Sequence, residues 1–260
     1  MSQISIVTIC FNNLEEMVST CLSVDRQEWL PYEHIIIDGS TNHDISNYLE
    51  NNPQPSYRKW LCERDKGIAD AFNKGIKRTS GDIILLLNSG DQLYDGSVLR
   101  RVAELFLSKP DIKWCHGKQN LFRGGLWVFI GKPFDRSKLY RGMRSVFHQT
   151  MYVKKELYDK YGLYDPSIKI AMDYDFVCRI ANEPFAFIDY PLATFDPAGV
   201  SNKRYIEGMK EGFARYRHYY GWSLKQQLWG LRLRILYFLL KGPLGTFLYK
   251  LKVLLGKENM

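Results

Sequence analysis

Short apolar runs alternate with amphipathic stretches over the first 110 residues, and polar residues follow each run. The runs are rich in isoleucine, valine and leucine, which is typical of buried strands, while the stretches between them have helical periodicity. This pattern predicts strands at 4–9, 34–37, 57–61 and 83–87, and helices at 14–24, 42–49, 67–77 and 97–107. Strands that alternate with helices at this spacing indicate an α/β fold with a mostly parallel sheet.

The pattern is less regular after residue 110. Extended segments are expected at 113–117, 126–131 and 185–188, a turn at Gly124-Gly125, and a helix at 173–181. From about residue 203 the composition becomes basic and aromatic. We therefore expect a domain at 1–202, divided into halves at 1–110 and 111–202, followed by a helical basic extension at 203–260.

Three of the predicted strands end in polar loops, which carry Asn12-Asn13, Asp38 and Asn88-Ser89-Gly90-Asp91. The carboxyl ends of parallel strands meet at one edge of a sheet, where open α/β sheets bind ligands. A carboxylate at that edge suits Mg²⁺ or Mn²⁺, which prefer oxygen ligands together with substrate phosphates. The pattern indicates one cleft for phosphate chemistry, although a phosphate-loop motif is absent.

Charge is unevenly distributed along the chain. The net charge of the chain is +8. Residues 203–257 hold 12 Lys and Arg against 2 Asp and Glu, a net charge of +10. An anionic partner is therefore expected to meet this segment.

Features of the whole chain favour a cytosolic protein. The five cysteines are scattered, which is typical of reduced thiols rather than of a disulfide framework. The opening residues do not resemble a signal peptide, and no charge-free apolar run reaches the roughly 18 residues of a membrane span.

The segment 221–257 predicts two helices separated at Gly242-Pro243. Its basic residues do not gather on one helical face, because Arg234 falls opposite Lys225 and Arg232. Aromatic residues among basic ones nevertheless fit an anionic membrane surface. The other interpretation is a helical hairpin that packs on the rest of the chain or on a second subunit of a homo-oligomer.

Four segments, taken in order, resemble the family 2 glycosyltransferases with the GT-A fold, in particular those of bacterial capsule, colanic-acid-like or O-antigen synthesis. The segments are SIVTICFNN, IIIDGSTNHD, ERDKGIADAFNKGIKRTSGDIILLLNSGD and MDYDFVCRI. The resemblance covers roughly residues 3–200. It implies a Rossmann-like sheet flanked by helices and transfer with inversion at the anomeric carbon. Residues 1–110 would bind the nucleotide-sugar and residues 111–202 the acceptor.

The same resemblance implies roles for single residues. Asp91 would bind a divalent metal, Mg²⁺ or Mn²⁺, and Asp173 would be the general base for an acceptor hydroxyl. Nucleotide-sugar contacts would come from Asn12, Asp38, Asp65 and Asn88. The acceptor or the diphosphate would be contacted by His148, Gln149 and Arg179.

The chain departs from the family pattern at two places. The metal motif often reads Asp-x-Asp-Asp, whereas Asn88-Ser89-Gly90-Asp91 has a single carboxylate. One carboxylate can suffice when phosphates and water complete the coordination, with weak metal affinity in the absence of the nucleotide. The second-strand motif has Ile37 where the family usually has a further acidic residue.

Each candidate residue also has a purely structural interpretation. Asp173 could be a helix cap, favoured by the helix dipole, and Asp65 could cap the helix that begins near Gly67. Asp91 lies in a sequence typical of a turn. His148 could be packed, and Arg179 could pair with Asp175 at i, i+4 spacing.

The expected function is therefore inverting transfer from a nucleotide-sugar, with UDP favoured by the resemblance, to a glycan or lipid-linked acceptor. The expected place is the inner face of the cytoplasmic membrane. A non-catalytic nucleotide-binding module is the alternative, because the metal motif has only one carboxylate. Nucleic-acid binding by the basic tail lacks a recognised motif, and no partner of that kind is expected. A dehydrogenase would need GxGxxG after the first strand, which is absent.

Overall fold

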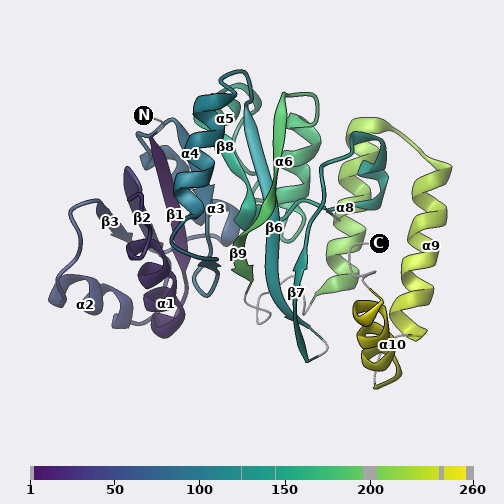
Figure 1. The fold of residues 1–260 in the computed structure, drawn as a ribbon, viewed down its shortest axis with the longest axis horizontal. Coiled ribbons are helices and arrows are strands. Elements are labelled where there is room, and N and C mark those ends of the chain that lie inside the picture. Colours follow the sequence, from purple (N-terminus) through teal and green to yellow (C-terminus); the bar gives the residue numbers. More distant parts are fainter. Residues whose placement is uncertain (1–2, 124, 144, 196–203, 240–242, 256–260) are drawn as a thin grey trace.

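The computed structural model describes residues 3–123, 125–143, 145–195, 204–239 and 243–255. Within these ranges the strands form one mixed sheet in the order β3-β2-β1-β4-β8-β6-β9-β5, and β7 pairs with β6 (Figure 1). The strands are β1 Ile4–Cys10, β2 Glu33–Asp38, β3 Arg58–Cys62, β4 Ile83–Leu86, β5 Gln92–Leu93, β6 Trp114–Arg123, β7 Leu126–Ile130, β8 Tyr152–Lys154 and β9 Phe185–Phe195.

Helices lie on both faces of the sheet and beyond its far end (Figure 1). The first of them are α1 Leu14–Asp25, α2 Asp44–Asn51, α3 Ile68–Arg78, α4 Val98–Ser108, α5 Lys155–Tyr161 and α6 Met172–Ile180. Two 3₁₀ turns, η1 Arg136–Arg141 and η2 His148–Thr150, precede β8, and α8 Tyr205–Tyr220, α9 Leu224–Leu239 and α10 Pro243–Leu254 follow β9.

Apart from the short strand β5, the first 110 residues fold as the sequence predicts. β1 pairs in parallel with both β2 and β4, and β2 pairs in parallel with β3. The strand order therefore reverses between β1 and β4, which makes their carboxyl ends a topological switch point of the kind that binds ligands in open α/β sheets. The polar residues after these two strands are thus brought to the place where a ligand site is expected.

Both faces of the parallel strands are buried, which explains why they are nearly continuous apolar runs. Val7 of β1 packs with Phe72 of α3 and Phe176 of α6 on one face. Ile6, its neighbour along the strand, packs on the other face with Leu99 of α4. Successive side chains of a strand point to opposite faces, so a single run supplies two cores.

The second half differs from expectation in the length and number of its strands. β6 and β9 continue well beyond the expected 113–117 and 185–188, because they pair with each other in parallel and β6 also pairs with β7. The register shift beside Gly117 and Lys118 marks an irregularity that the polar sequence there does not reveal. β5, β8 and α5 were not predicted. They are too short to carry a periodic pattern, and their neighbours decide their conformation. Gly124 of the expected turn lies outside the described residues.

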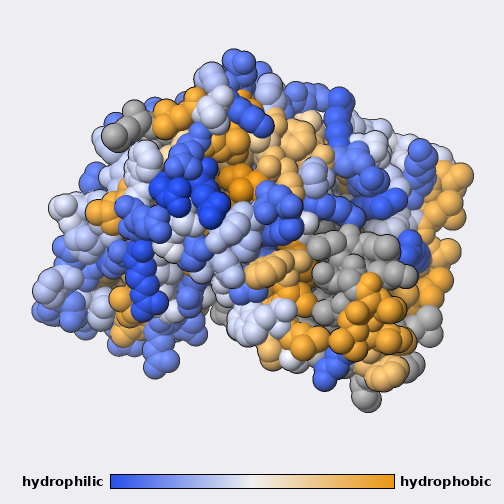
Figure 2. Space-filling model, in the orientation of Figure 1, coloured by the Kyte–Doolittle hydropathy of each residue, from blue (hydrophilic) through white to orange (hydrophobic). Residues whose placement is uncertain are grey.

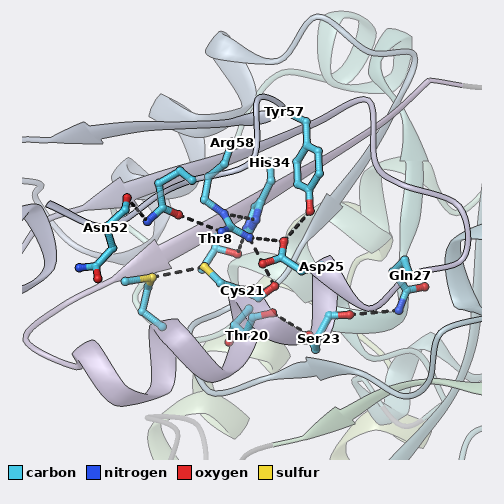
Figure 3. Close-up of polar contacts among 12 residues, drawn as sticks. Thr8, Thr20, Cys21, Ser23, Asp25, Gln27, His34, Asn52, Tyr57 and Arg58 are labelled. Atoms are coloured by element: carbon cyan, nitrogen blue, oxygen red, sulfur yellow. Dashed lines mark hydrogen bonds and ion pairs between the residues drawn. The ribbon is translucent and has the colours of Figure 1, made fainter. Parts of the chain in front are cut away.

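A buried polar network links the starts of β2 and β3 to the last residue of α1 (Figure 3). Arg58 donates to Asp25 at 2.6 Å and to Nδ1 of His34 at 3.3 Å, while Nε2 of His34 lies 2.9 Å from the Thr8 hydroxyl. Burial, reinforced by the Arg58 guanidinium, lowers the pKa of His34 to about 3. The imidazole is therefore neutral, accepts from Arg58 at Nδ1 and donates to Thr8 from Nε2.

The C-terminal helices pack on the second half of the sheet domain. The Tyr219 hydroxyl lies 3.0 Å from a carboxylate oxygen of Asp175 in α6, and Trp229 of α9 packs against Tyr140 of η1. α9 and α10 match the two helices expected after residue 221, whereas α8 was not predicted as a separate helix. The domain boundary expected near residue 203 lies outside the described residues. Among those described, no helix has the length and apolarity that crossing a membrane requires.

Candidate active site

The loops after β1 and β2 are joined by direct hydrogen bonds. The backbone N–H of Asn12 donates to the Ser40 hydroxyl at 2.8 Å, and the Asn12 side-chain oxygen accepts from the Thr41 N–H at 2.9 Å. Asn12 has a φ of 52°, the only positive φ of a non-glycine residue in the described chain. Asparagine tolerates this conformation better than most residues, so its type fits a tight turn that leads into α1.

The loop after β3 approaches the end of β2 at Gly39. A Cβ atom on Gly39 would lie 1.8 Å from a carboxylate oxygen of Asp65, so only glycine lets this carboxylate come so close. Asp38 is buried at the end of β2 and accepts from the Ser40 N–H at 3.0 Å. Asp65 also accepts from the Gly67 N–H at 2.7 Å, before the start of α3. Asp65 therefore shapes the turn before α3 and reaches the Asp38 loop as well.

The loop after β4 carries Asn88 and Asp91. The Asn88 side-chain nitrogen lies 3.0 Å from Nε2 of His148 in η2. Nε2 in turn lies 4.0 Å from a carboxylate oxygen of Asp91, whose residue is only 3% exposed. With Asn88 as donor, Nε2 of His148 accepts and the imidazole proton lies on Nδ1. The Asn88 oxygen is buried without a hydrogen-bond partner. A buried polar atom of this kind is normally satisfied by water, an ion or a ligand.

His148 also faces Asp173, in the first turn of α6. Its Nδ1 lies 3.8 Å from a carboxylate oxygen of Asp173. Burial raises the pKa of Asp173 to about 6 and lowers the pKa of His148 to about 4. The imidazole is therefore neutral at pH 7, and its contacts with the two carboxylates are not ion pairs. Asp91, His148 and Asp173 therefore form a row, with the imidazole between the two carboxylates.

Thr20 of α1 holds the loop that ends in Asp91. Its hydroxyl accepts from the Gly90 N–H at 2.9 Å and donates to the Asp91 carbonyl at 2.8 Å. The turn has Gly90 at a φ of 99°, which favours glycine. Sequence reasoning did not identify Thr20, since a threonine within an amphipathic helix has no local signal of this role.

Two expected site residues point away from the row. Gln149 is buried and donates to the Gln119 side chain at 2.7 Å. Arg179 pairs with Asp175 at 3.1 Å and donates to the carbonyls of Tyr161 and Gly162. Arg179 therefore links α6 to the end of α5, in agreement with its structural interpretation.

The segment that leads into α6 is held by a side chain of a distant helix. Glu211 of α8 accepts from the backbone N–H groups of Lys169, Ile170 and Ala171, at 3.2, 2.8 and 3.0 Å. The Asp173 side chain accepts from the Tyr174 N–H, in the first turn of α6, at 2.7 Å. Asp173 thus contacts a first-turn N–H of α6, in agreement with its structural interpretation, while Glu211, about 40 residues later in the chain, fixes the segment before the helix. Glu211 could not be found from spacing, because only the tertiary fold brings it to α6.

The residues present fit a divalent cation that a phosphorylated ligand helps to coordinate. Asp91 supplies one carboxylate, and the unpartnered Asn88 oxygen beside it is a neutral oxygen donor. Among the described residues no group of three or more His, Cys, Asp or Glu could hold a metal without further ligands. Mg²⁺ is commonly bound by one or two carboxylates together with phosphates and water, so this donor set is adequate only when the ligand is bound.

Comparison with known proteins shows which family this chain belongs to. The model of the family described as "Glycosyl transferase family 2" matches residues 5–158. An uncharacterized glycosyltransferase of Mycobacterium tuberculosis is 34% identical over 207 residues, which cover 77% of this chain and 78% of that protein. A PGL/p-HBAD biosynthesis glycosyltransferase of Mycobacterium bovis is 26% identical over 180 residues, covering 66% and 67%.

Solved structures share the fold at low sequence identity. The S. aureus TarS fragment 1-349 in complex with UDP-GlcNAc has a TM-score of 0.61 and 15% identity, covering 87% of this chain and 70% of that one. A longer S. aureus TarS chain has also been solved, and this protein spans 42% of its length. A mannosyltransferase of Pyrobaculum calidifontis in complex with GDP-Man and Mn²⁺ has a TM-score of 0.59 and 15% identity, covering 94% and 77%. The expected GT-A fold is confirmed, and the chain is a glycosyltransferase that belongs to glycosyl transferase family 2.

Proposed function

We propose that this glycosyltransferase moves a sugar from a nucleotide-sugar to an acceptor hydroxyl with inversion of configuration. The acceptor would be a glycan or a lipid-linked oligosaccharide of bacterial surface polysaccharide synthesis. The observation that carries the proposal is the row Asp91–His148–Asp173, with a buried carboxylate at one end and a carboxylate of raised pKa at the other. These two ends suit the leaving group and the attacking group of a single displacement.

The donor would lie over the joined loops after β1, β2 and β3. Asn12 shapes the first loop, while Asp38 and Asp65 place carboxylates where the hydroxyls of a nucleoside could donate to them. UDP is the nucleotide favoured by the family resemblance. Fold relatives have been solved with UDP-GlcNAc and with GDP-Man, so GDP also needs testing.

The diphosphate would lie at the end of β4. Asp91 would hold Mg²⁺ or Mn²⁺ there, with the Asn88 oxygen as a further donor. Such a cation would stabilise the charge that develops on the departing nucleoside diphosphate. Thr20 and Gly90 keep the loop closed around Asp91 through their hydrogen bonds.

Asp173 would act as the general base. At pH 7 a carboxyl of pKa about 6 is mostly ionised yet basic enough to accept a proton from a hydroxyl. The acceptor oxygen would form its bond to the anomeric carbon as the bond from that carbon to the phosphate oxygen breaks, and the proton would pass to Asp173. Attack from the face opposite the leaving group inverts the anomeric centre. Neutral His148, with its Nδ1 proton facing Asp173, would orient the base without neutralising it.

The alternative is a module that binds a nucleotide without catalysis. The single carboxylate of the metal motif favours this reading. Nucleotide binding would then occur, but neither sugar transfer nor hydrolysis of the donor would follow.

The test is titration calorimetry of UDP, GDP and dTDP, with and without Mn²⁺. We expect one nucleotide to bind more tightly with Mn²⁺, and Asp91→Asn to lose that enhancement. Asp173→Asn is the matched control, since it removes a carboxylate from the other end of the row and should bind the nucleotide as wild type does while failing to transfer sugar. Binding of none of the three nucleotides would overturn the proposal, and binding without transfer or donor hydrolysis by the wild type would favour the module.

A further inference from the structure

The outer side of α9 carries an apolar stripe. Leu224, Leu228, Leu231 and Ile235 follow one another at helical spacing and are each at least half exposed. The opposite side is packed: Leu233 is buried, and a Cβ on Gly230 would lie 2.4 Å from a ring carbon of Phe213 in α8. α9 therefore has mainly apolar residues on two sides, one exposed and one buried, with Gln226 as a polar exception on the buried side.

Because only one apolar side of α9 is exposed, the positions of its basic residues are to be compared with that exposed stripe. With about 100° between successive residues, Lys225 and Arg232 lie roughly a quarter turn from the stripe on one flank, and Arg234 lies as far away on the other. The basic residues that seem scattered in a helical projection thus border the exposed stripe on both flanks. This arrangement is typical of a helix that lies in a membrane interface with its basic side chains reaching the headgroups.

The same features continue onto α10. Phe247, Leu251 and Leu254 are exposed at i, i+4 and i+7 positions. Lys250 of the same helix approaches the turn of the β6–β7 hairpin, since a Cβ on Gly125 would lie 3.4 Å from its Nζ atom. The hairpin and α10 are therefore neighbours.

The hairpin adds exposed aromatic residues. Trp127 is 61% exposed, and Phe129, two residues along β7, is 44% exposed on the same face. Phe122 of β6 packs against Trp127, with ring centroids 5.4 Å apart, and is also exposed. Figure 2 shows hydrophobic side chains gathered over α10 and along the outer edge of α9. Monomeric soluble proteins rarely expose contiguous apolar patches of large size without a partner.

We propose that α9, α10 and the β6–β7 hairpin form a surface that docks on an anionic lipid bilayer. We call it the docking surface. The charged residues of α9 and α10 are all basic, so anionic headgroups complement these helices, whereas the same surface on a second copy would repel them. These residues are Lys225, Arg232, Arg234, Lys250 and Lys252. No described helix can span a membrane, so the surface would lie along the bilayer.

The position of the docking surface relative to the candidate active site indicates how docking could serve catalysis. In Figure 1 the carboxyl end of β1, the tip of the β6–β7 hairpin and α10 all lie toward the lower side of the molecule. Docking through the hairpin tip and α10 would bring the candidate active site near the headgroup layer. This role rests on the proposed function, in which the acceptor can be lipid-linked. Such an acceptor would then be confined to the membrane surface that the enzyme occupies.

The test is co-sedimentation of the full chain with vesicles of phosphatidylcholine, alone or mixed with phosphatidylglycerol. We expect binding to the mixed vesicles, weakened by salt, and little binding to phosphatidylcholine alone. Leu228→Glu combined with Leu231→Glu should lower the partition constant at least about tenfold, because apolar insertion is replaced by repulsion from anionic lipid. Leu107→Glu combined with Leu30→Glu is the matched control, since these leucines are 54% and 52% exposed and lie outside the docking surface.

A second pair of variants separates charge from apolar insertion. Arg232→Glu with Arg234→Glu should weaken binding to the mixed vesicles several-fold, while Lys77→Glu with Arg78→Glu, which makes the same charge change at the end of α3, should not. Trp127→Glu should weaken binding although it lies far from α9 in sequence.

Two results would overturn the proposal. One is absence of wild-type binding to the mixed vesicles at low salt. The other is a dimer that dissociates in the Leu228/Leu231 variant with no change in vesicle binding, which would assign the surface to a second copy. Nucleotide binding by each variant, measured without vesicles, reports whether it is folded and keeps the outcome separate from that of the proposed function.

Discussion

Glu211 of α8 accepts a hydrogen bond from the N–H of Ala171, the residue immediately before α6, at 3.0 Å. Glu211 also accepts from the N–H groups of Lys169 and Ile170, so it fixes the segment that leads into α6, and a carboxylate near the start of a helix interacts favourably with the helix dipole. Two residues after Ala171 is Asp173, the proposed base. A side chain of the C-terminal helices thus determines how the helix of the base begins.

Glu211→Ala should lower kcat while leaving nucleotide affinity unchanged. The change loosens the start of α6, and Glu211 contacts none of the loops after β1, β2 and β3 over which the donor would lie. The unfolding free energy should fall by about 1–3 kcal/mol, because backbone N–H groups lose a charged acceptor. Glu211→Gln keeps an acceptor and should recover most of kcat. Glu207→Ala on the same helix, where Glu207 pairs only with exposed Arg204, is the control. An equal loss of nucleotide affinity and of kcat in Glu211→Ala would contradict a positioning role.

The activity of the wild type should rise with pH and level off above neutrality. A base works only in its carboxylate form, and burial raises the pKa of Asp173 to about 6, so kcat/KM should reach half of its plateau near that pH. Asp173→Asn should lower kcat by about 10²–10⁴, the usual contribution of a general base. Initial rates across the acidic and neutral range would measure both effects. A profile with no inflection near pH 6 would argue against Asp173 as the base.

Gly39→Ala should weaken nucleotide binding at least about tenfold, since the added Cβ would lie 1.8 Å from the Asp65 carboxylate and force that loop away. Gly39 does not have a positive φ, so the effect is steric rather than a matter of backbone strain. Gly212→Ala is the matched control, because there the Cβ would meet Tyr174 at an ordinary 3.6 Å. Calorimetry with the preferred nucleotide would compare them, and equal affinities would show that Asp65 does not contribute to binding.

Acid should destabilise the protein through its buried histidines. Burial lowers the pKa of His116 to about 4 and of His34 to about 3, whereas unfolding restores values near 6.5. The neutral forms contribute full stability above about pH 6.5, and each contribution is lost as pH falls toward the folded pKa, at up to about 1.4 kcal/mol per pH unit per histidine. Urea unfolding at a series of pH values would show this slope.

His116→Phe should reduce the acid sensitivity and leave stability at neutral pH equal or higher. Neither ring nitrogen of His116 has a hydrogen-bond partner, and its neighbours include Trp114, Phe185 and Phe187. An apolar ring therefore removes an unsatisfied polar group from the core. His43→Gln, at an exposed position before α2, is the control and should keep the wild-type slope. A marked loss of stability at pH 7 in His116→Phe would mean that the imidazole makes a contact that the apolar ring cannot replace.

The sequence alone predicted the first half of the fold and the residues that carry the proposed chemistry. Apolar strands and amphipathic helices are local patterns, and the carboxyl ends of parallel strands must share an edge, so Asn12, Asp38 and Asp91 could be assigned to one cleft before their positions were known. The family resemblance added Asp173 and His148, whose roles no local pattern indicates. Their roles stay predictions until the experiments above are done.

Only the tertiary structure decided which candidates meet and which turn away. It places His148 between two carboxylates and directs Gln149 and Arg179 into other contacts, because side-chain direction depends on packing between elements distant in the chain. It also brings Glu211 to the start of α6 and leaves one apolar side of α9 exposed. A helix that is apolar on two sides has no clear amphipathic pattern, so its sequence cannot tell which side is buried. Pairing, capping and exposure of this kind are decided by the neighbours that folding supplies.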